Sequence, residues 1–194
     1  MEMTAVDERR MTELFENIDV PEGVKIELLR GEIVMMAGPD LVHNRIVRSV
    51  ALQMPSDRWE WLLTQDIDIL SEQSEPVPDL VVLESGAGPE SGRLLPSAVV
   101  TMVVEVVSKT SVDRDYGVKR SLYAAGKIPA YLIVDPIVAH CVLLTEPFGS
   151  GDEADYAVQR ISKFGESVPV DVLDVELETG DFGILPGVRR HRRP

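Results

Sequence analysis

A run of β-branched residues in the middle of the chain constrains the fold more than any other feature. Residues 99–107 read VVTMVVEVV, and residues 79–83 (DLVVL) and 130–136 (AYLIVDP) have the same apolar character. A strand with one wet face alternates polar and apolar residues, whereas a nearly continuous apolar run is typical of a strand buried on both faces. The sequence therefore predicts a sheet whose middle strands are covered on both sides.

Segments with helical and hairpin patterns lie before, between and after these strands. Apolar residues three and four positions apart predict helices over 11–18 and over 40–55, the second capped by Asp40. Ser111 or Asp113 near the start and Gly126 at the end predict a third helix over 111–126. Apolar strands on either side of Arg30-Gly31 predict a β-hairpin, and residues 59–70 predict a further strand. This order of elements predicts an α/β protein in the α+β sense, with a central mixed sheet flanked by helices and an N-terminal helix and hairpin.

The 194 residues of the chain are enough for one domain. We expect a flexible N-terminus over 1–10, a single domain over 11–186 and a disordered basic tail over 187–194. The tail holds Arg189, Arg190, Arg192 and Arg193. Residues 1–10 lack the apolar segment of a signal peptide, and no apolar run approaches the length of a membrane span. These features predict a soluble cytoplasmic protein with no membrane partner.

The charge and the motifs of the chain exclude several classes of protein. With 19 Lys and Arg against 33 Asp and Glu, the net charge is -14, and such a body repels phosphate backbones. A role on nucleic acid would therefore need a local site, a divalent cation or a partner. The single cysteine, Cys141, excludes an intramolecular disulfide and a cysteine zinc site. A phosphate-binding P-loop and an H-E-x-x-H zinc motif are both absent from the sequence.

Glu105 is the main anomaly, because it lies inside a strand that is otherwise apolar. A buried carboxylate costs several kcal/mol unless a cation pairs with it or it binds a metal. Two interpretations are open at this point. In the first, Glu105 has a structural role and pairs with a Lys or Arg or faces water at a sheet edge. In the second, it is a functional ligand.

Two further residues can join Glu105. Asp79 follows Pro78 at the start of a neighbouring apolar strand, so adjacent strands could bring Asp79 and Glu105 to the same end of a sheet. Two carboxylates with waters are a natural Mg²⁺ site. Asp115, Lys119 and Tyr123 share one helix face by their spacing. Either Asp115 and Lys119 form a surface pair, or Lys119 is aimed at the carboxylates, where it can hold a phosphate or a water.

These residues resemble two known patterns. Pro78-Asp79, then Glu105 in a hydrophobic strand, then a lysine, resembles the PD-(D/E)XK superfamily of restriction-endonuclease-like nucleases. Residues 105–136 more closely resemble the Uma family of predicted restriction endonucleases. That likeness rests on Glu105-Val106-Val107-Ser108, Asp115, Lys119, Tyr123 and the strand Tyr131 to Pro136, and the hairpin at 27–32 and His43 fit the family's opening pattern. The likeness spans residues 12–183.

The resemblance implies a restriction-endonuclease-like core and a metal-dependent endonuclease that acts on nucleic acid, DNA before RNA. It implies that Asp79 and Glu105 hold Mg²⁺ or Mn²⁺ and that Lys119 assists catalysis, with no organic cofactor. The superfamily's lysine would fall at position 107, where this chain has valine, and Lys109 competes with Lys119 for the role.

Several assignments stay open beside this one. Glu27 is a candidate for a further carboxylate at the site, and His43 for a supporting or substrate contact. A homodimer is also left open. The alternative functions are a non-catalytic binding or regulatory module on the same fold, and a metal-dependent hydrolase of another phosphoester.

Overall fold

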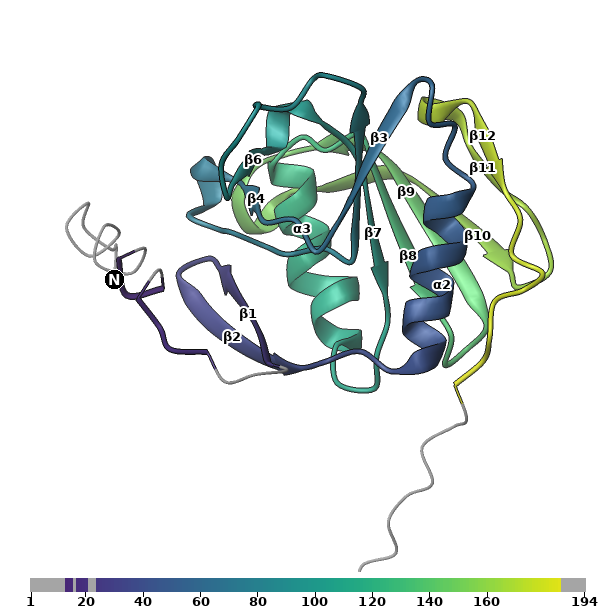
Figure 1. The fold of residues 1–194 in the computed structure, drawn as a ribbon, viewed down its shortest axis with the longest axis horizontal. Helices are drawn as coiled ribbons and strands as arrows, with labels where there is room; N and C mark the ends of the chain where they lie inside the picture. The colour runs from purple at the N-terminus through teal and green to yellow at the C-terminus, as the bar shows by residue number, and fades with distance from the viewer. Residues whose placement is uncertain (1–12, 16, 21–23, 186–194) are drawn as a thin grey trace, which may run out of the picture.

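A six-stranded mixed β-sheet forms the centre of the computed structural model, which describes residues 13–15, 17–20 and 24–185 (Figure 1). Its strands are β3 (Trp59–Leu63), β5 (Leu80–Glu84), β7 (Val100–Val106), β8 (Ala130–Asp135), β9 (His140–Phe148) and β10 (Asp155–Lys163). They lie in the order β10-β9-β8-β7-β5-β3, in which β7 and β8 are parallel and the other neighbours antiparallel. The mixed sheet predicted from the sequence is confirmed.

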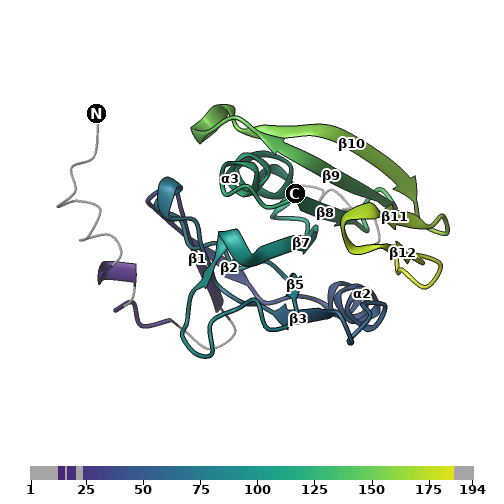
Figure 2. The ribbon, with the colours of Figure 1, turned by 90° about the horizontal axis from the view of Figure 1, so that it is seen from above.

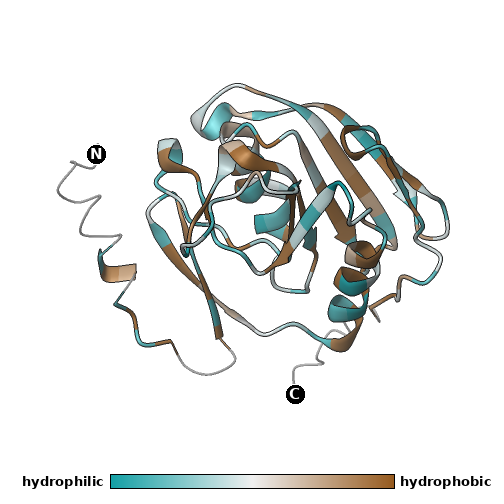
Figure 3. Ribbon diagram, turned by 45° about the horizontal axis from the view of Figure 1, so that its top comes forward, coloured by the Kyte–Doolittle hydropathy of each residue, from teal (hydrophilic) through white to brown (hydrophobic). Residues whose placement is uncertain are grey.

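Two helices, α2 (Leu41–Leu52) and α3 (Lys119–Ala125), cover opposite faces of this sheet (Figure 2). Ile46 and Val50 of α2 belong to one buried cluster with Val104, whereas Leu122 of α3 belongs to another with Val103. Successive residues of a strand point to opposite faces, so a strand covered on both sides must be apolar at every position. This explains the β-branched run, and Figure 3 shows hydrophobic residues along the central strands.

The predicted hairpin consists of β1 (Val24–Leu29) and β2 (Glu32–Ala37), which pair in antiparallel register. Arg30 and Gly31 form its two-residue turn with φ of 49° and 77°. Positive φ at both central positions is the geometry that matches the twist of a hairpin, and glycine adopts it without strain. The hairpin lies beside α3, to which it is tied by a contact between Glu27 and Lys119.

Some predicted elements differ from those observed. The strand predicted over 59–70 ends at Leu63, because Thr64 has a φ of 49° and the chain turns before resuming as β4 (Ile67–Asp68), which pairs with β6 (Leu95–Pro96). The third helix opens with a π-helical turn, η3 (Arg114–Val118), before α3. Near the C-terminus, β11 (Val168–Val170) and β12 (Val175–Leu177) form a separate hairpin on the α2 face. The 3-10 turns are η1 (Leu70–Glu72), η2 (Ser97–Val99), η4 (Gly151–Glu153) and η5 (Asp171–Leu173).

The ends of the chain lie outside the described residues. Of the helix predicted over 11–18, residues 13–15 are helical, while 11, 12 and 16 are not described. The expectations for 1–10 and for 187–194 also fall outside the described part. None of the helices in the described ranges is long and apolar enough to span a membrane.

Candidate active site

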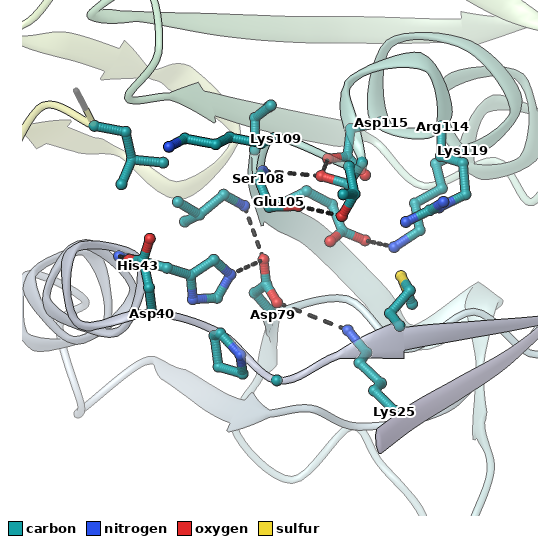
Figure 4. Close-up of a pocket in the computed structure, with 18 residues that line it drawn as sticks. Lys25, Asp40, His43, Asp79, Glu105, Ser108, Lys109, Arg114, Asp115 and Lys119 are labelled. Carbon is teal, nitrogen blue, oxygen red and sulfur yellow. Dashed lines mark hydrogen bonds and ion pairs between the residues drawn. The ribbon is translucent and has the colours of Figure 1, made fainter. Parts of the chain in front are cut away.

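A cavity of about 270 Å³ lies where the β1–β2 hairpin, the start of α2, the end of β7 and the start of α3 meet (Figure 4). We call it the site cavity. Its lining contains four Lys or Arg residues and four Asp or Glu residues, so it is formally neutral in a chain of net charge -14. The lining residues are Lys25, Met36, Gly38, Pro39, Asp40, His43, Asp79, Glu105, Val106, Val107, Ser108, Lys109, Thr110, Ser111, Arg114, Asp115, Lys119 and Leu185.

The pairing of β5 with β7 brings Asp79 and Glu105 together. Leu80 pairs with Val104 in antiparallel register, so the next positions outward, Asp79 and Glu105, lie opposite each other. Side chains at opposed positions of neighbouring strands share a face of the sheet, and here it is the face covered by α3. Both carboxylates therefore reach the site cavity, as the sequence predicted.

Asp79 is held by donors from three elements. Its Oδ2 accepts hydrogen bonds from the backbone N–H of Val106 at 2.8 Å and from His43 Nε2 at 2.9 Å, and Lys25 Nζ lies 3.7 Å from Oδ1. Burial alone would raise the pKa of Asp79. The His43 hydrogen bond, the Lys25 charge and the Val106 N–H outweigh burial and lower this pKa to about 2. Asp79 is thus ionised at neutral pH.

His43 owes its position to the way α2 begins. The Asp40 side chain accepts a hydrogen bond from the His43 backbone N–H and caps the helix, as predicted. This places the imidazole in the first turn, next to Asp79. Burial lowers the pKa of His43, but the Asp79 hydrogen bond and charge outweigh that effect and raise it. His43 is therefore part of the site and is not a simple helix-surface residue.

Glu105 is 3 % exposed and is bonded from α3. Its Oε1 accepts hydrogen bonds from Lys119 Nζ at 2.7 Å and from the Tyr123 hydroxyl at 2.6 Å. Burial raises the pKa of Glu105, and the charge of Lys119 acts against that rise. The anomalous carboxylate in the apolar strand is thus paired with a lysine, and that lysine is the one the sequence singled out.

Lys119 connects two buried carboxylates. Besides Glu105, its Nζ donates to Glu27 Oε1 at 3.0 Å, and Lys119 is itself only 2 % exposed. Burial lowers the pKa of Lys119, but Glu105 and Glu27 outweigh burial and raise it, so Lys119 stays protonated. Because both residues of the helix pair are buried, the alternative of a surface pair between Asp115 and Lys119 is wrong.

Glu27 is fully buried at the base of the site. Its Oε1 also accepts a hydrogen bond from the Val77 backbone N–H at 2.9 Å, whereas its Oε2 has no hydrogen-bond partner among the described residues. The prediction of a further carboxylate beside the pair is consistent with this position. Lys25 was not predicted, although it lies two residues before Glu27 and a strand repeats its facing every second residue. That spacing is the signal that could have identified it.

Lys109 occupies the wall of the cavity instead of its base. β7 ends at Val106, so the strand does not continue far enough to point Lys109 at Glu105. Within the described ranges, Lys109 makes no hydrogen bond or ion pair. Lys119, and not Lys109, is therefore the lysine in contact with Glu105.

Asp115 is a second acidic group beside Lys119. It is 2 % exposed, and Ser111 Oγ donates a hydrogen bond to its carboxylate while the Tyr131 hydroxyl donates to its backbone carbonyl at 2.9 Å. Burial raises the pKa of Asp115 to about 6, more than the Lys119 charge lowers it. The π-helical turn, a type of irregularity frequent at functional sites, is the element that carries this residue.

Comparisons with known proteins agree with this fold. The structure is similar to a solved protein of Anabaena variabilis described as "a putative nuclease belonging to DUF820", with a TM-score of 0.65 and 14% sequence identity over 89% of this chain and 96% of that one. At that identity the likeness concerns the fold alone, a mixed α+β architecture around a central mixed sheet. Residues 12–181 match the Uma2 family, described as "Putative restriction endonuclease". The chain belongs to this family.

A curated relative is also similar in sequence. This is "Uncharacterized protein sll1609" of Synechocystis sp., which is 25% identical over 153 residues, or 71% of this chain and 86% of the relative.

Proposed function

We propose that this protein is a metal-dependent endonuclease that hydrolyses phosphodiester bonds of DNA. The observation that carries the proposal is the placement of Asp79 and Glu105 side by side at one end of two paired strands, with Lys119 bonded to Glu105. Membership of the Uma2 family supports the same reaction.

The donor set suits a hard divalent cation. Each carboxylate of the pair has one oxygen fixed by the protein, while Asp79 Oδ1 and Glu105 Oε2 accept no hydrogen bond from any described residue. No three His, Cys, Asp or Glu side chains of the described residues gather into a metal site by themselves. Mg²⁺ requires no such cage, since it is commonly held by one or two carboxylates and keeps several waters.

Asp79 and Glu105 would hold the ion, which supplies positive charge for a phosphoryl transition state. The other residues have separate roles. His43 and the Val106 N–H keep Asp79 ionised and oriented, and the Tyr123 hydroxyl orients one oxygen of Glu105. Lys119 stays protonated, so we assign it to orienting Glu105 and adding positive charge near the phosphate, and not to removing a proton from water.

The charge of the site cavity differs from that of the chain as a whole, which matters for binding a phosphate. A body of net charge -14 repels DNA at long range. The cavity lining is balanced, with Lys25, Lys109, Arg114 and Lys119 against four acids, so a divalent ion makes it positive. Local attraction of one phosphate is then compatible with weak non-specific binding elsewhere.

The test is cleavage of supercoiled plasmid DNA at low salt with Mg²⁺, Mn²⁺ or a chelator. We expect metal-dependent nicking that falls roughly a hundredfold or more in Asp79→Asn and in Glu105→Gln, because each loses a charged ligand. Glu84→Gln is the matched control, since Glu84 is an exposed carboxylate at the other end of β5. Its cleavage rate should equal that of the wild type.

Calorimetric titration with Mn²⁺ separates the metal from the substrate. Binding by the wild type and its loss in Glu105→Gln would support the carboxylate pair even where DNA is not cut, and would point to a different phosphoester. Cleavage that persists in both carboxylate variants would refute the proposed site. Neither cleavage nor Mn²⁺ binding by the wild type would favour the non-catalytic module.

A further inference from the structure

Arg114 stands between the site cavity and a second cavity of about 440 Å³, and it lines both. The second cavity, which we call the hairpin cavity, lies between the turn of the β1–β2 hairpin and the start of α3. Its walls are Leu29, Arg30, Glu32, Val34, Arg114, Val118, Ser121 and Asp152. Arg114 is the first residue of the π-helical turn, so its Cα is held in a regular backbone element.

Among the described residues, the guanidinium of Arg114 lacks the carboxylate partner that the other buried or half-buried Lys and Arg side chains have. Among described Lys and Arg residues that are not exposed, Lys25, Arg30, Lys119 and Arg120 each form an ion pair with a carboxylate. Arg114 forms none, and its Nε is buried without an acceptor. Because this half-buried arginine has no carboxylate partner among the described residues, a ligand is the natural source of its acceptor.

A second arginine of the hairpin cavity has the same feature. Arg30 bonds to Gly151 O at 2.8 Å and pairs with Glu72 and Asp152, but its Nε is also buried without an acceptor. Arg30 and Arg114 both line this cavity, and two guanidinium groups on its walls suit an anion with several acceptor oxygens. Phosphate matches the planar fork of a guanidinium, which can donate two parallel hydrogen bonds to it.

The remaining walls of the hairpin cavity suit the rest of a nucleotide. Leu29, Val34 and Val118 give it an apolar side, and its volume is within the range of small-ligand pockets. A strand with one phosphate at the carboxylate pair would meet Arg114 next along its backbone, because the two cavities share that residue.

We propose that Arg114 binds the phosphate adjacent to the one that is cleaved and directs that DNA strand into the hairpin cavity. This inference rests on the proposed function and adds the path of the substrate. It assigns to Arg114 a substrate-binding role that was not predicted from the sequence.

The test measures binding of a short fluorescein-labelled single-stranded DNA to the full chain, with Ca²⁺ in place of Mg²⁺, over a series of salt concentrations. Arg114→Ala should lower affinity about tenfold to a hundredfold, as expected for a charge-assisted hydrogen bond, and should reduce the salt slope by about 0.7. Arg114→Lys keeps the charge but not the fork, so it should keep the slope and lose part of the affinity. Arg160→Ala is the control, because Arg160 lies on β10 outside both cavities and pairs with Asp171.

A second variant tests the path. Ser121→Trp fills the hairpin cavity without changing charge, so it should weaken binding and leave the salt slope unchanged. Wild-type binding by this variant would overturn the path. An unchanged affinity and slope in Arg114→Ala would overturn the role of Arg114, even if plasmid cleavage proves the proposed function. If the wild type cuts no DNA and binds none, the proposed function fails and this inference fails with it.

Discussion

Replacing Lys119 by methionine tests how the site is held together. Methionine nearly matches the length of lysine and keeps the packing, but it removes the ammonium that bonds to Glu105 at 2.7 Å and to Glu27 at 3.0 Å. Both carboxylates are at least 97 % buried, at 3 % and 0 % exposure. Water cannot replace the lost charge at these positions, so the substitution leaves two carboxylates without their counter-ion.

Removing one partner of a buried ion pair costs about 3 to 5 kcal/mol, because an uncompensated charge remains. Two carboxylates share this lysine, so we expect Lys119→Met to fall in the upper half of that range. With a urea dependence of about 2 kcal/mol per molar, the unfolding midpoint should fall by roughly 2 M. Adding Glu27→Gln removes one of the two carboxylates that have lost their counter-ion. The double variant should therefore recover about 1 to 3 kcal/mol of the free energy of unfolding.

The measurement is urea unfolding of the full chain at neutral pH, followed by the fluorescence of Trp59 and Trp61. Lys163→Met is the matched control, since Lys163 is exposed on β10 and its loss should change stability by less than about 0.5 kcal/mol. A loss below about 1 kcal/mol in Lys119→Met would refute the reasoning. So would a double variant that is no more stable than Lys119→Met alone.

Two further predictions concern buried titrating groups. Folded Asp115 has a pKa of about 6 against 3.8 for the ordinary group, so it stabilises the fold below about pH 4, and that stability is lost as pH rises to about 6. Asp115→Asn should therefore gain about 3 kcal/mol relative to the wild type across this window, measured by urea unfolding at a series of pH values, whereas the exposed neighbour Asp113→Asn should not. Burial raises the pKa of the Cys141 thiol to about 12, so dithionitrobenzoate at about pH 8 should react with it only after unfolding. Rapid labelling of the native protein would contradict the burial of Cys141.

The parts of the fold that local patterns determine were predictable. Residues 99–107 are apolar at nearly every position, on both faces of the strand. Only a strand that is covered on both faces requires this pattern, and the strand is β7. Arg30-Gly31 between two apolar strands gave the hairpin, because a two-residue turn needs positive φ. Asp79 and Glu105 could be placed together by assuming that their strands are neighbours, which the antiparallel register confirms.

The contacts that join distant segments were not predictable in the same way. Glu27 and Lys119 are 92 positions apart, and no periodicity in either segment encodes their meeting. The break after Leu63 was missed because the left-handed residue there is Thr64, which carries no turn signal comparable to glycine. The π-helical turn was missed because the end signals of 111–126, Ser111 or Asp113 and Gly126, carry no information on the hydrogen-bond pattern inside the helix.

The innermost charges of the site imply an order of binding. Glu27, Asp79 and Glu105 are three acidic side chains held by two lysines, Lys25 and Lys119, so the lysines are one positive charge short once all three acids are ionised. A phosphate would be repelled by that group and by the acidic chain around it. A divalent ion reverses the sign. We therefore expect DNA to bind after the metal, and the basic cavity wall formed by Lys109 and Arg114 to attract the phosphate only once the carboxylate pair has been neutralised.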